Sequence, residues 1–424
     1  MASKVAVIGT GYVGLTTGAC LASLGHRVTC ADIDVDKIAL LASGRIPIVE
    51  RGLESLVAEG LRTGNLSFIA DPKSAAADCE IAFLCVPTPQ GDDGSADLSY
   101  VQSAASNIAS HLPFESIVVN KSTVPVGSTK VVERALQRPD VKVVSNPEFL
   151  REGSAVDDFM KPDRVVVGSD DQASAMKVAS LYESLSTRVI ITDPASAETI
   201  KYAANAFLAT KLSFINAIAA ICEGVGADIN DVIVGMGSDH RIGQDFLRPG
   251  PGWGGSCFPK DSRALIKIAE TAGYRFSLLE GVVDVNNEQL DRVSRKIVAD
   301  NGAGRTIAVW GLTFKANTDD LRDSPAVAII DRLLARGVAV VAYDPTVPEF
   351  RPGVPDGVRL ASSPVEACTG ADVLAVLTEW DDFKWIDPAD VARVMTGRHI
   401  VDGRNILDRS QWRKVGFDYE GIGR

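Results

Sequence analysis

The sequence predicts an α/β fold with two Rossmann-like doubly wound domains joined by a long central helix. A strand, a glycine-rich turn and a helix open the chain, and an acidic residue follows the second strand. A stretch of about 30 residues without a helix breaker lies near the middle. Strand and helix segments then alternate again through the last third. Because 424 residues are too many for one core, we expect domains at 1–193, 194–300 and 301–424.

The first residues form a dinucleotide-binding pattern. Lys4–Ile8 is a short apolar strand segment, and a GxGxxG motif follows it directly. The first glycine permits a tight turn, the second lets the backbone approach a pyrophosphate, and the third lets helix and strand pack closely. The helix that begins here directs its amide hydrogens at the phosphates. The predicted cofactor contacts in this motif are Gly9, Gly11, Tyr12, Val13 and Gly14.

Asp32 ends the second predicted strand, Arg27–Ala31. A carboxylate there accepts hydrogen bonds from the ribose hydroxyls and repels a 2′-phosphate, which predicts NAD rather than NADP as the cofactor. Lys37 follows shortly after. It lies either near the adenosine or in solvent as an ordinary helix lysine, and the sequence leaves both open.

Polar residues follow three further apolar strands of the first domain. In open α/β sheets, ligands bind beyond the carboxyl ends of the strands, so we expect these residues near a ligand. Glu152 would share a helical face with Glu148 if Phe149–Arg151 were helical, although acidic residues also favour an ordinary helix start. The three polar residues at the ends of these strands are Thr88 after Ile81–Val86, Thr123 after Ser116–Asn120, and Glu148 after Val141–Ser145.

The central helix is predicted from Ala195 to about Gly224, opened by Pro194. It spans on the order of 45 Å, too long for one small core, which predicts that it links two domains and packs against a second subunit. Lys201 and Asn205 lie one turn apart and share a face. An asparagine in so apolar a segment is normally a satisfied core residue, but beside a lysine it is a candidate oxyanion stabiliser.

The stretch from Pro249 to Asp261 is the strongest candidate for a reactive site. Its glycines and prolines exclude a regular helix or strand interior and favour a tight loop against a ligand. Cys257 follows the glycines, with Lys260 next to Asp261 shortly after. A neighbouring cation favours a thiolate, so we prefer a nucleophilic cysteine to a buried structural one.

A second doubly wound unit begins at Arg305 and carries no full GxGxxG motif. It should therefore hold a nucleotide differently from the first. Lys315 and Arg322 lie between its first strand and helix and are candidate phosphate contacts, although a charged loop usually faces water.

Composition narrows the function classes. Apolar content of 46% and charged content of 23% are typical of a soluble globular protein, and a net charge of −12 argues against nucleic-acid or anionic-membrane partners. The 7 cysteines lack CxxC spacing, so we expect neither disulfides nor a metal site. Because no signal peptide and no apolar run of membrane-spanning length is evident, we expect a cytoplasmic protein.

The motifs together resemble the UDP-glucose/GDP-mannose dehydrogenase family, over nearly the whole chain. Ala217 departs from the acidic residue that many relatives carry there, which should not affect the chemistry. Ser256 before the cysteine favours UDP-glucose, since relatives acting on N-acetylated sugars tend to have a histidine there. The matching motifs are GTGYVG at 9–14, KSTVPVG at 121–127, NPEFLREG at 146–153, KYAANAFLATKLSFIN at 201–216, GGSCFPKD at 254–261 and GLTFKANTDDLRDSP at 311–325.

The resemblance implies that the chain oxidises the primary alcohol of UDP-glucose twice with NAD, giving a carboxylate. By this analogy the aldehyde is captured on a cysteine as a thiohemiacetal, oxidised to a thioester and hydrolysed. The three domains would be NAD-binding, helical and dimer-forming, and nucleotide-sugar-binding, in chain order.

The resemblance also implies site roles residue by residue. Arg241 would reach the sugar of a neighbouring subunit in a homodimer. The implied catalytic residues are Cys257 as nucleophile, Lys201 and Asn205 at the oxyanion, Asp261 and Thr123 at the water, and Glu148 in hydrolysis. Cofactor contacts would add Lys37, Thr88, Thr123, Glu152, Lys260 and Arg322. Substrate contacts would be Glu148, Phe149, Leu150, Arg151, Glu152, Lys201, Asn205, Arg241, Phe246, Leu247, Arg248, Pro249, Gly250, Gly254, Phe314 and Lys315.

Three alternatives remain open at this point. The same chemistry can act on GDP-mannose or a UDP-N-acetylhexosamine. A two-electron β-hydroxyacid dehydrogenase also joins a dinucleotide domain to a long helix, but it needs neither the cysteine nor the second α/β unit. A non-catalytic NAD-binding sensor would leave Lys201, Asn205, Cys257 and Asp261 without a shared purpose.

Overall fold

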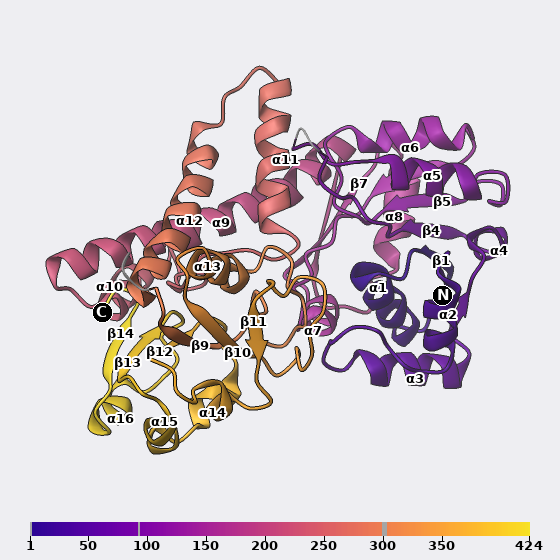
Figure 1. The fold of residues 1–424 in the computed structure, drawn as a ribbon. Coiled ribbons are helices and arrows are strands. Elements are labelled where there is room, and N and C mark those ends of the chain that lie inside the picture. The colour runs from indigo at the N-terminus through magenta and orange to yellow at the C-terminus, as the bar shows by residue number, and fades with distance from the viewer. Residues whose placement is uncertain (1, 92–93, 299–302) are drawn as a thin grey trace. The chain divides into compact units, whose positions relative to one another are not determined.

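The computed structural model describes residues 2–91, 94–298 and 303–424 (Figure 1). The chain forms two compact units, and their boundary falls within helix α9 (Pro194–Val225). The predicted division into three domains stays a prediction, and its second boundary, at 300, lies outside the described residues. The first unit contains Met1–Ala204 with Arg263–Gly273, and the second contains Asn205–Ser262 with Tyr274–Arg424.

The first unit is built on an eight-stranded sheet of order β3-β2-β1-β4-β5-β6-β7-β8. Its strands are parallel, except that β7 runs antiparallel to β6. The strands that the apolar runs predicted, β1, β2, β4, β5 and β6, lie within one residue or two of their expected bounds. The strands are β1 (Lys4–Ile8), β2 (Arg27–Ala31), β3 (Leu66–Ile69), β4 (Ile81–Leu84), β5 (Ile117–Asn120), β6 (Lys142–Ser145), β7 (Arg164–Gly168) and β8 (Arg188–Thr192).

Helices cover both faces of this sheet, which is why its strands are apolar without alternation. Val5 and Val7 of β1 pack in the cluster with α1, α3, α7 and α8, whereas Ala6 and Ile8 pack with α4, α5 and α6. The fold prediction of a doubly wound domain is confirmed here. The helices are α1 (Tyr12–Ser23), α2 (Val35–Ala42), α3 (Leu53–Thr63), α4 (Pro72–Ala77), α5 (Ser99–Ile108), α6 (Ser128–Leu136), α7 (Ala155–Met160) and α8 (Gln172–Ser180).

The second unit repeats this plan with a six-stranded parallel sheet of order β11-β10-β9-β12-β13-β14. Ile307 and Val309 face α12, α13 and the end of α9, and Ala308 and Trp310 face α14, α15 and α16. The strands are β9 (Thr306–Trp310), β10 (Ala339–Tyr343), β11 (Val358–Leu360), β12 (Val373–Val376), β13 (His399–Asp402) and β14 (Asp418–Gly421). The helices are α10 (Ile229–Gly237), α11 (Phe258–Thr271), α12 (Ser277–Ile297), α13 (Pro325–Leu334), α14 (Pro364–Ala367), η1 (Asp381–Trp385), α15 (Pro388–Val394) and α16 (Arg409–Lys414).

Helix α9 corrects the expectation that no apolar segment reaches membrane-spanning length. Among the described helices it is the one that is long and apolar enough, by length and composition only, to cross a membrane. Ser213 and Asn216 within its apolar stretch are buried, and they bond to the backbone of Val282 and Gly250. Since the core helix of a globular protein meets the same test, we interpret α9 as a core helix.

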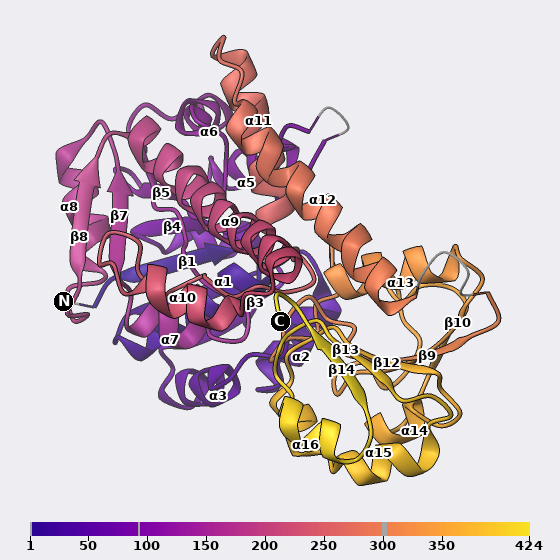
Figure 2. The same cartoon turned by 90° about the vertical axis from the view of Figure 1, so that its left-hand side faces the viewer.

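The glycine-rich loop before Cys257 is held by side-chain amides from two helices. Asn216 of α9 accepts a hydrogen bond from the Gly250 amide at 2.8 Å. Asn286 of α12, which lies beside α9 (Figure 2), accepts from the Trp253 amide at 2.8 Å and donates to its carbonyl at 3.0 Å. The loop is therefore fixed through its backbone as well as by the buried side chain of Trp253, whose indole N–H donates to the Ser213 hydroxyl at 2.8 Å.

Candidate active site

The glycine turn has the geometry that the motif predicts. Gly9 has a φ of 98°, in the left-handed region that favours glycine. A β-carbon on Gly14 would lie 1.9 Å from the Gly9 carbonyl oxygen, so helix α1 packs against the turn as closely as a glycine allows. At Gly11, among the described residues, nothing lies within 4 Å of such a carbon, and α1 has no side-chain cap there. Within the described chain, the start of α1 therefore has no side-chain cap, and the space beside Gly11 is open.

Asp32 lies at the carboxyl end of β2, next to this turn. Its Oδ2 accepts hydrogen bonds from the Thr10 amide at 2.8 Å and the Thr10 hydroxyl at 2.7 Å, and it pairs with Lys37 Nζ at 2.9 Å. Partial burial alone would raise the pKa of Asp32, but these donors hold it at about 2. Lys37 thus pairs with the predicted ribose-binding carboxylate, and its expected place near the adenosine stays a prediction.

The strand-end residues Thr88 and Thr123 are in contact, since the Thr88 hydroxyl donates to the Thr123 carbonyl at 2.9 Å. The same loop is tied to α9 by Glu198, a residue that the sequence analysis missed. Its buried carboxylate accepts from the amides of Gly127 at 2.6 Å and Thr129 at 3.0 Å. Gly127 cannot cap helix α6 with a side chain of its own, so the first amides of α6 need an acceptor from elsewhere in the chain. This need was the sequence signal that could have pointed to a residue such as Glu198.

Glu148 and Lys201 form a buried ion pair. Glu148 Oε1 and Lys201 Nζ lie 2.8 Å apart, and the two side chains are 5% and 4% exposed. Glu148 Oε2 also accepts from the Leu150 amide at 2.6 Å. Burial would raise the pKa of Glu148, but Lys201 and the Leu150 amide outweigh it and hold the pKa below its ordinary value. The carboxylate is therefore ionised in the working pH range.

The proposed helical turn between Glu148 and Glu152 is wrong. The segment after β6 is irregular up to a turn at Glu152, because the Glu148 carboxylate bonds to the chain two residues on. The Arg164 guanidinium lies over the Phe149 ring, 3.7 Å from the ring centroid. Lys201 Nζ lies 5.5 Å from the same centroid. Arg151 is exposed and paired with Asp158 at 2.5 Å.

In the second unit, Asp261 bonds to two of the other predicted residues. Its Oδ2 accepts from the Asn205 amide nitrogen at 2.6 Å, and its Oδ1 pairs with Lys260 Nζ at 2.7 Å. Asp261 is 1% exposed. Lys260, expected next to the cysteine thiolate, thus has a carboxylate partner, and Asn205 is oriented by the same carboxylate.

Cys257 immediately precedes helix α11. Its carbonyl accepts the amide of Asp261 at 2.9 Å, the first hydrogen bond of that helix. Its Sγ lies 3.6 Å from the Ser256 hydroxyl. It is half-buried, whereas the other cysteines of the described chain are buried. A helix N-terminus stabilises a negative charge on a group placed there, which suits a thiolate.

The residues expected to hold the nucleotide sugar surround the same loop. A β-carbon on Gly254 would lie 1.9 Å from the Asp323 carbonyl, and one on Gly255 would lie 2.7 Å from the Phe314 ring. Arg404, which the sequence analysis missed, lies 3.4 Å from a β-carbon on Gly250 and donates to the Phe314 carbonyl at 3.0 Å. The remaining expected contacts are Phe246, with a φ of 62°, Leu247, Pro249 and Gly250, which are buried or half-buried, exposed Arg248, and Lys315, 5.4 Å above the Phe314 ring.

Two predicted arginine contacts form local ion pairs at the surface. Arg241 pairs with Asp239, and Arg322 pairs with Asp320, each at 2.5 Å. Their side chains are 78% and 65% exposed. A ligand phosphate would therefore have to compete with a carboxylate for either guanidinium.

The predicted residues fall into two groups, one in each unit. The first unit holds Gly9, Gly11, Tyr12, Val13, Gly14, Asp32, Lys37, Thr88, Thr123, Glu148, Phe149, Leu150, Arg151, Glu152 and Lys201. The second holds Asn205, Arg241, Phe246, Leu247, Arg248, Pro249, Gly250, Gly254, Cys257, Lys260, Asp261, Phe314, Lys315 and Arg322. Helix α9 carries both Lys201 and Asn205.

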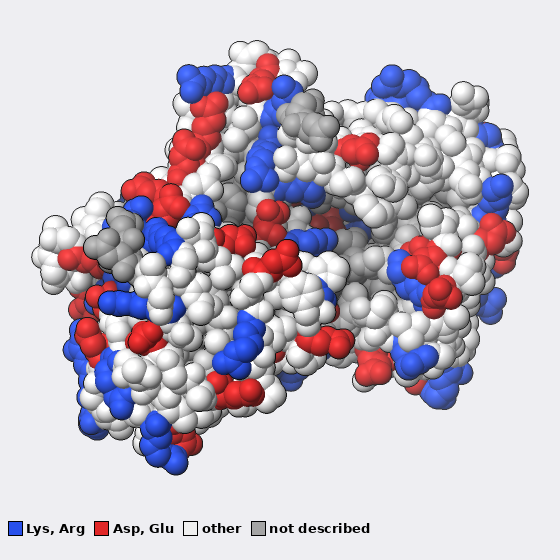
Figure 3. Space-filling view, in the orientation of Figure 1, with Lys and Arg blue, Asp and Glu red and all other residues white. Residues whose placement is uncertain are grey.

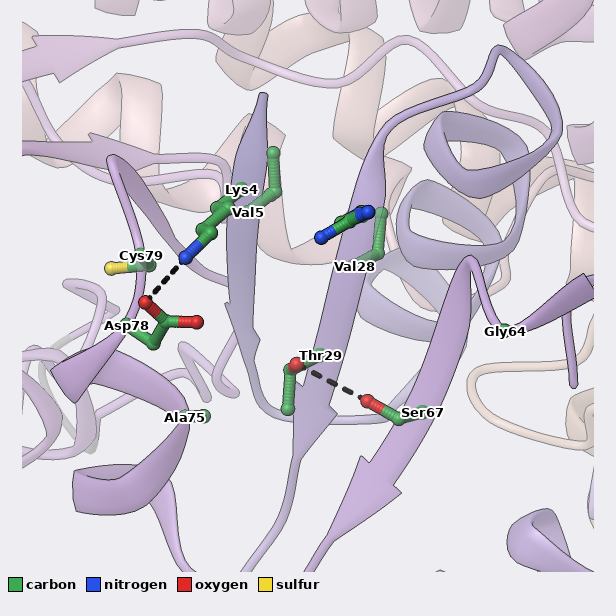
Figure 4. Close-up of a pocket in the computed structure, with 10 residues that line it drawn as sticks. Lys4, Val5, Val28, Thr29, Gly64, Ser67, Ala75, Asp78 and Cys79 are labelled. Atoms are coloured by element: carbon green, nitrogen blue, oxygen red, sulfur yellow. Dashed lines mark hydrogen bonds and ion pairs between the residues drawn. The ribbon is translucent and has the colours of Figure 1, made fainter. Parts of the chain in front are cut away.

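A small cavity of about 210 Å³ in the first unit is lined by none of these residues (Figure 4). It is lined at the starts of β1 and β2, where Lys4 pairs with Asp78 at 2.6 Å and Thr29 bonds to Ser67 at 3.1 Å. Parallel sheets bind ligands at the opposite, carboxyl ends. In the described part of the chain, no group of three or more His, Cys, Asp or Glu residues is arranged to hold a metal ion.

Models of one protein family match most of the chain. They are the NAD binding domain at residues 3–186, the central domain at 195–288 and the UDP binding domain at 308–409. The chain belongs to the UDP-glucose/GDP-mannose dehydrogenase family. It is accordingly an NAD-dependent oxidoreductase, with the cofactor that the glycine motif and Asp32 predicted.

Relatives of this dehydrogenase match along its full length. It is 46% identical to a UDP-glucose 6-dehydrogenase of Rhizobium meliloti, covering 99% of both chains. A UDP-glucose dehydrogenase structure from Pyrobaculum islandicum has a TM-score of 0.92 at 35% identity, covering 100% of this chain and 98% of that one. A UDP-D-ManNAc dehydrogenase structure from Pyrococcus horikoshii has a TM-score of 0.86 at 27% identity, covering 99% of each.

The turn in this dehydrogenase fits NAD. The open space at Gly11 and the amides at the start of α1 suit a pyrophosphate. Asp32 is ionised and suits ribose hydroxyls. Figure 3 shows acidic and basic residues interspersed on the face it presents, so the anionic parts of a cofactor depend on local groups such as these.

The contacts of Asp32 predict cofactor choice. The unmodified protein should prefer NAD strongly over NADP, because the carboxylate repels a 2′-phosphate. Asp32→Ala should narrow that preference at least tenfold, a difference of about 1.4 kcal/mol, and it releases Lys37 to meet the phosphate. The measurement is kcat/KM for each cofactor, with exposed Asp36→Ala as the matched control. Equal use of both cofactors by the unmodified protein would contradict the role of Asp32.

Proposed function

We propose that this protein is a UDP-glucose 6-dehydrogenase that oxidises UDP-glucose to UDP-glucuronate through a covalent intermediate on Cys257. The observation that carries the proposal is the half-buried Cys257 at the start of α11, in the same unit as the hydrogen-bonded group of Lys260, Asp261 and Asn205. A chain that needed only one hydride transfer would have no use for a nucleophile. The 46% identity to a UDP-glucose 6-dehydrogenase supports the choice of substrate.

The reaction removes four electrons in two steps. Bound NAD supplies the hydride acceptor in each oxidation. Loss of a hydride and a hydroxyl proton from C6 of the sugar gives an aldehyde, and the Cys257 thiolate adds to its carbon to form a thiohemiacetal. Loss of the second hydride and the remaining hydroxyl proton gives a thioester. Water then adds to the thioester carbonyl, and the thiolate leaves to give the carboxylate.

In the first unit, the proposed roles rest on the Glu148–Lys201 pair. Lys201 is a buried cation that stabilises negative charge on the reacting oxygen. Glu148 is ionised and contacts the sugar, and it assists hydrolysis. Thr123, bonded through its carbonyl to Thr88, contributes to ordering water and cofactor. Glu152 lies between sugar and cofactor in this assignment.

In the second unit, Asp261 is assigned to hold and polarise the hydrolytic water. Its carboxylate bonds to Asn205 and so fixes which way the amide points. Asn205 has a second amide hydrogen to give to the thiohemiacetal oxygen. Lys260 balances the buried charge of Asp261 and is assigned to the cofactor side. Phe314, Lys315 and the loop residues Phe246 to Gly250 are assigned to the nucleotide sugar.

The stoichiometry of NADH tests the function. UDP-glucose should yield two NADH per molecule consumed, without free aldehyde, because the intermediate stays bound to Cys257 between the steps. The measurement combines NADH absorbance with quantification of UDP-glucuronate, and GDP-mannose and UDP-N-acetylhexosamines serve as comparison substrates. One NADH per substrate with released aldehyde would refute the four-electron reaction, and a higher kcat/KM for another nucleotide sugar would refute the substrate.

The variant Cys257→Ser tests the nucleophile. The change is nearly isosteric, so substrate and NAD should still bind, while steady turnover should fall by about three orders of magnitude or more, corresponding to about 4 kcal/mol. Stopped-flow kinetics and calorimetric binding provide the measurements. Cys222→Ser, at a buried cysteine of α9, is the control and should keep its turnover per folded molecule. Normal turnover by folded Cys257→Ser would leave the cysteine a structural role only.

We also propose that the protein forms a homodimer through α9. One face of this helix carries four exposed apolar residues at helical spacing, which is the pattern of an interface. Phe207, Phe214, Ile221 and Val225 leave 66%, 49%, 57% and 72% of their surface exposed.

The oligomeric state tests this surface. The unmodified protein should sediment as a dimer, and Ile221→Glu should shift it toward monomer because a buried unpaired carboxylate opposes association. Phe350→Glu, at an exposed phenylalanine off this helix, is the control. An unmodified monomer, or a dimer unaffected by Ile221→Glu, would exclude α9 as the interface.

A cytoplasmic location is likewise our proposal. It is supported by the absence of disulfides among the described cysteines, as expected in a reducing compartment. Recovery of the protein in the soluble fraction of disrupted cells would agree with it, and recovery in the membrane fraction would refute it.

A further inference from the structure

Lys121 is a buried cation for which the proposed reaction has no role. It directly follows β5, and 5% of the residue is exposed. Its ammonium donates to Asn146 Oδ1 at 3.1 Å and lies 3.5 Å from the Tyr182 hydroxyl. Both partners are neutral, and within the described residues no ion pair to Lys121 is found. A buried charge without a counterion within bonding distance is costly, so it calls for an explanation.

The partners of Lys121 connect it to the Glu148–Lys201 pair. Tyr182 donates to the same Asn146 oxygen at 2.6 Å, and Asn146 in turn donates to the Val166 carbonyl at 2.7 Å. Asn146 begins the segment that carries Glu148. The hydrogen bonds therefore link the Lys121 ammonium to that segment and to Tyr182, which packs in the apolar cluster that the sheet forms with α1 and α8.

Four titratable groups face Lys121 or share its partners: Glu148, Lys201, Cys85 and Tyr182. Burial raises the pKa of Cys85 to about 12 and raises that of Tyr182 still further, so both are neutral at working pH. The charged members are thus two lysines and one glutamate. Glu148 attracts both ammonium groups, and the two ammonium groups repel each other.

We infer that Lys121 is a positioning residue that sets the protonation state of Lys201 through the buried Lys121–Glu148–Lys201 cluster. The inference rests on the proposed function for Lys201 as a charged stabiliser of the reacting oxygen. Because the three groups share one buried region, protons leave them as a coupled set rather than singly. The ammonium of Lys121 eases proton loss from Lys201 and favours the ionised form of Glu148.

Burial is the main cause of the shift in the pKa of Lys121. Burial lowers the pKa of Lys121 to about 8, below its ordinary value of 10.5, and Glu148 only partly offsets this. Between those two pH values the unfolded chain binds the proton that the folded chain has lost, so folding stability rises with pH there. Below about pH 8 the charged lysine reduces stability, and removing it should stabilise the fold.

Two substitutions of Lys121 test the inference, and they should shift the alkaline limb of the kcat–pH profile in opposite directions. Lys121→Met keeps the length of the side chain and removes the charge. The alkaline limb of the kcat–pH profile should then move up by about one pH unit, because Lys201 keeps its proton longer. Lys121→Arg stays charged above pH 8, where Lys121 itself would be neutral, so the same limb should move down. Lys130→Met, at an exposed lysine of α6 in the same unit, should leave the limb in place.

Stability provides a readout that does not need activity. The Tm of Lys121→Met should exceed that of the unmodified protein at pH 7, and the difference should shrink toward pH 10 as Lys121 loses its charge. A lysine with a merely structural role would give the opposite result, a lower Tm at pH 7, and that result would overturn the inference. An active enzyme whose alkaline limb stays unmoved in both variants would overturn it as well.

Failure of the proposed function is distinguishable from failure of this inference. If the unmodified protein oxidises no nucleotide sugar, the function is wrong, and the Tm comparison still decides whether Lys121 is a charged, destabilising group.

Discussion

The buried pair of Glu148 and Lys201 is the constraint around which the first unit is arranged. Taking both charges out of water costs several kcal/mol for each ion, and the 2.8 Å contact offsets that cost only while both partners stay in place. The surrounding structure holds them there: Leu150 donates to the carboxylate, and Glu198 ties α9 to the loop that carries Thr123. Apolar side chains of similar volume would stabilise the fold more simply. The pair is therefore better explained by chemistry than by stability.

Both sheets carry an acidic residue at the equivalent position after the second strand, but the two carboxylates have different surroundings. An acid ends the second strand of each unit, and a threonine beside the preceding turn donates to it, Thr10 to Asp32 and Thr313 to Asp344. Asp32 keeps a partly exposed carboxylate beside Lys37. Asp344 is 2% exposed and also accepts the Trp380 indole N–H at 3.1 Å. Because both oxygens of Asp344 accept hydrogen bonds within the protein, this carboxylate is not placed to accept from a ribose as Asp32 is, which accords with the missing glycine motif.

In the second unit, the glycine-rich loop before Cys257 packs through Trp253 and has little other side-chain surface for packing. Amide side chains of α9 and α12 bond to its backbone instead, and the close approach of Gly254 to the Asp323 carbonyl excludes any larger residue. Cys257 emerges from this fixed loop at the start of α11, where the helix dipole favours negative charge. Glycine here serves close packing of backbone on backbone, whereas the sequence analysis identified the loop because its glycines and prolines exclude regular structure and favour a tight loop against a ligand.

The sequence by itself determined the two doubly wound units, the glycine turn, Asp32 and the candidate residues at strand ends, because apolar runs and glycine requirements are local properties of a chain. Only the tertiary structure decided how those residues are paired. Lys260 pairs with Asp261, the turn at Glu148 is not helical, Glu198 caps α6 from a distant helix, and Lys121 is buried among neutral partners. The contacts of Glu198 and Lys121 join groups that the packing of separate elements brings together. The strength of all the charge interactions depends on burial, which no local pattern records.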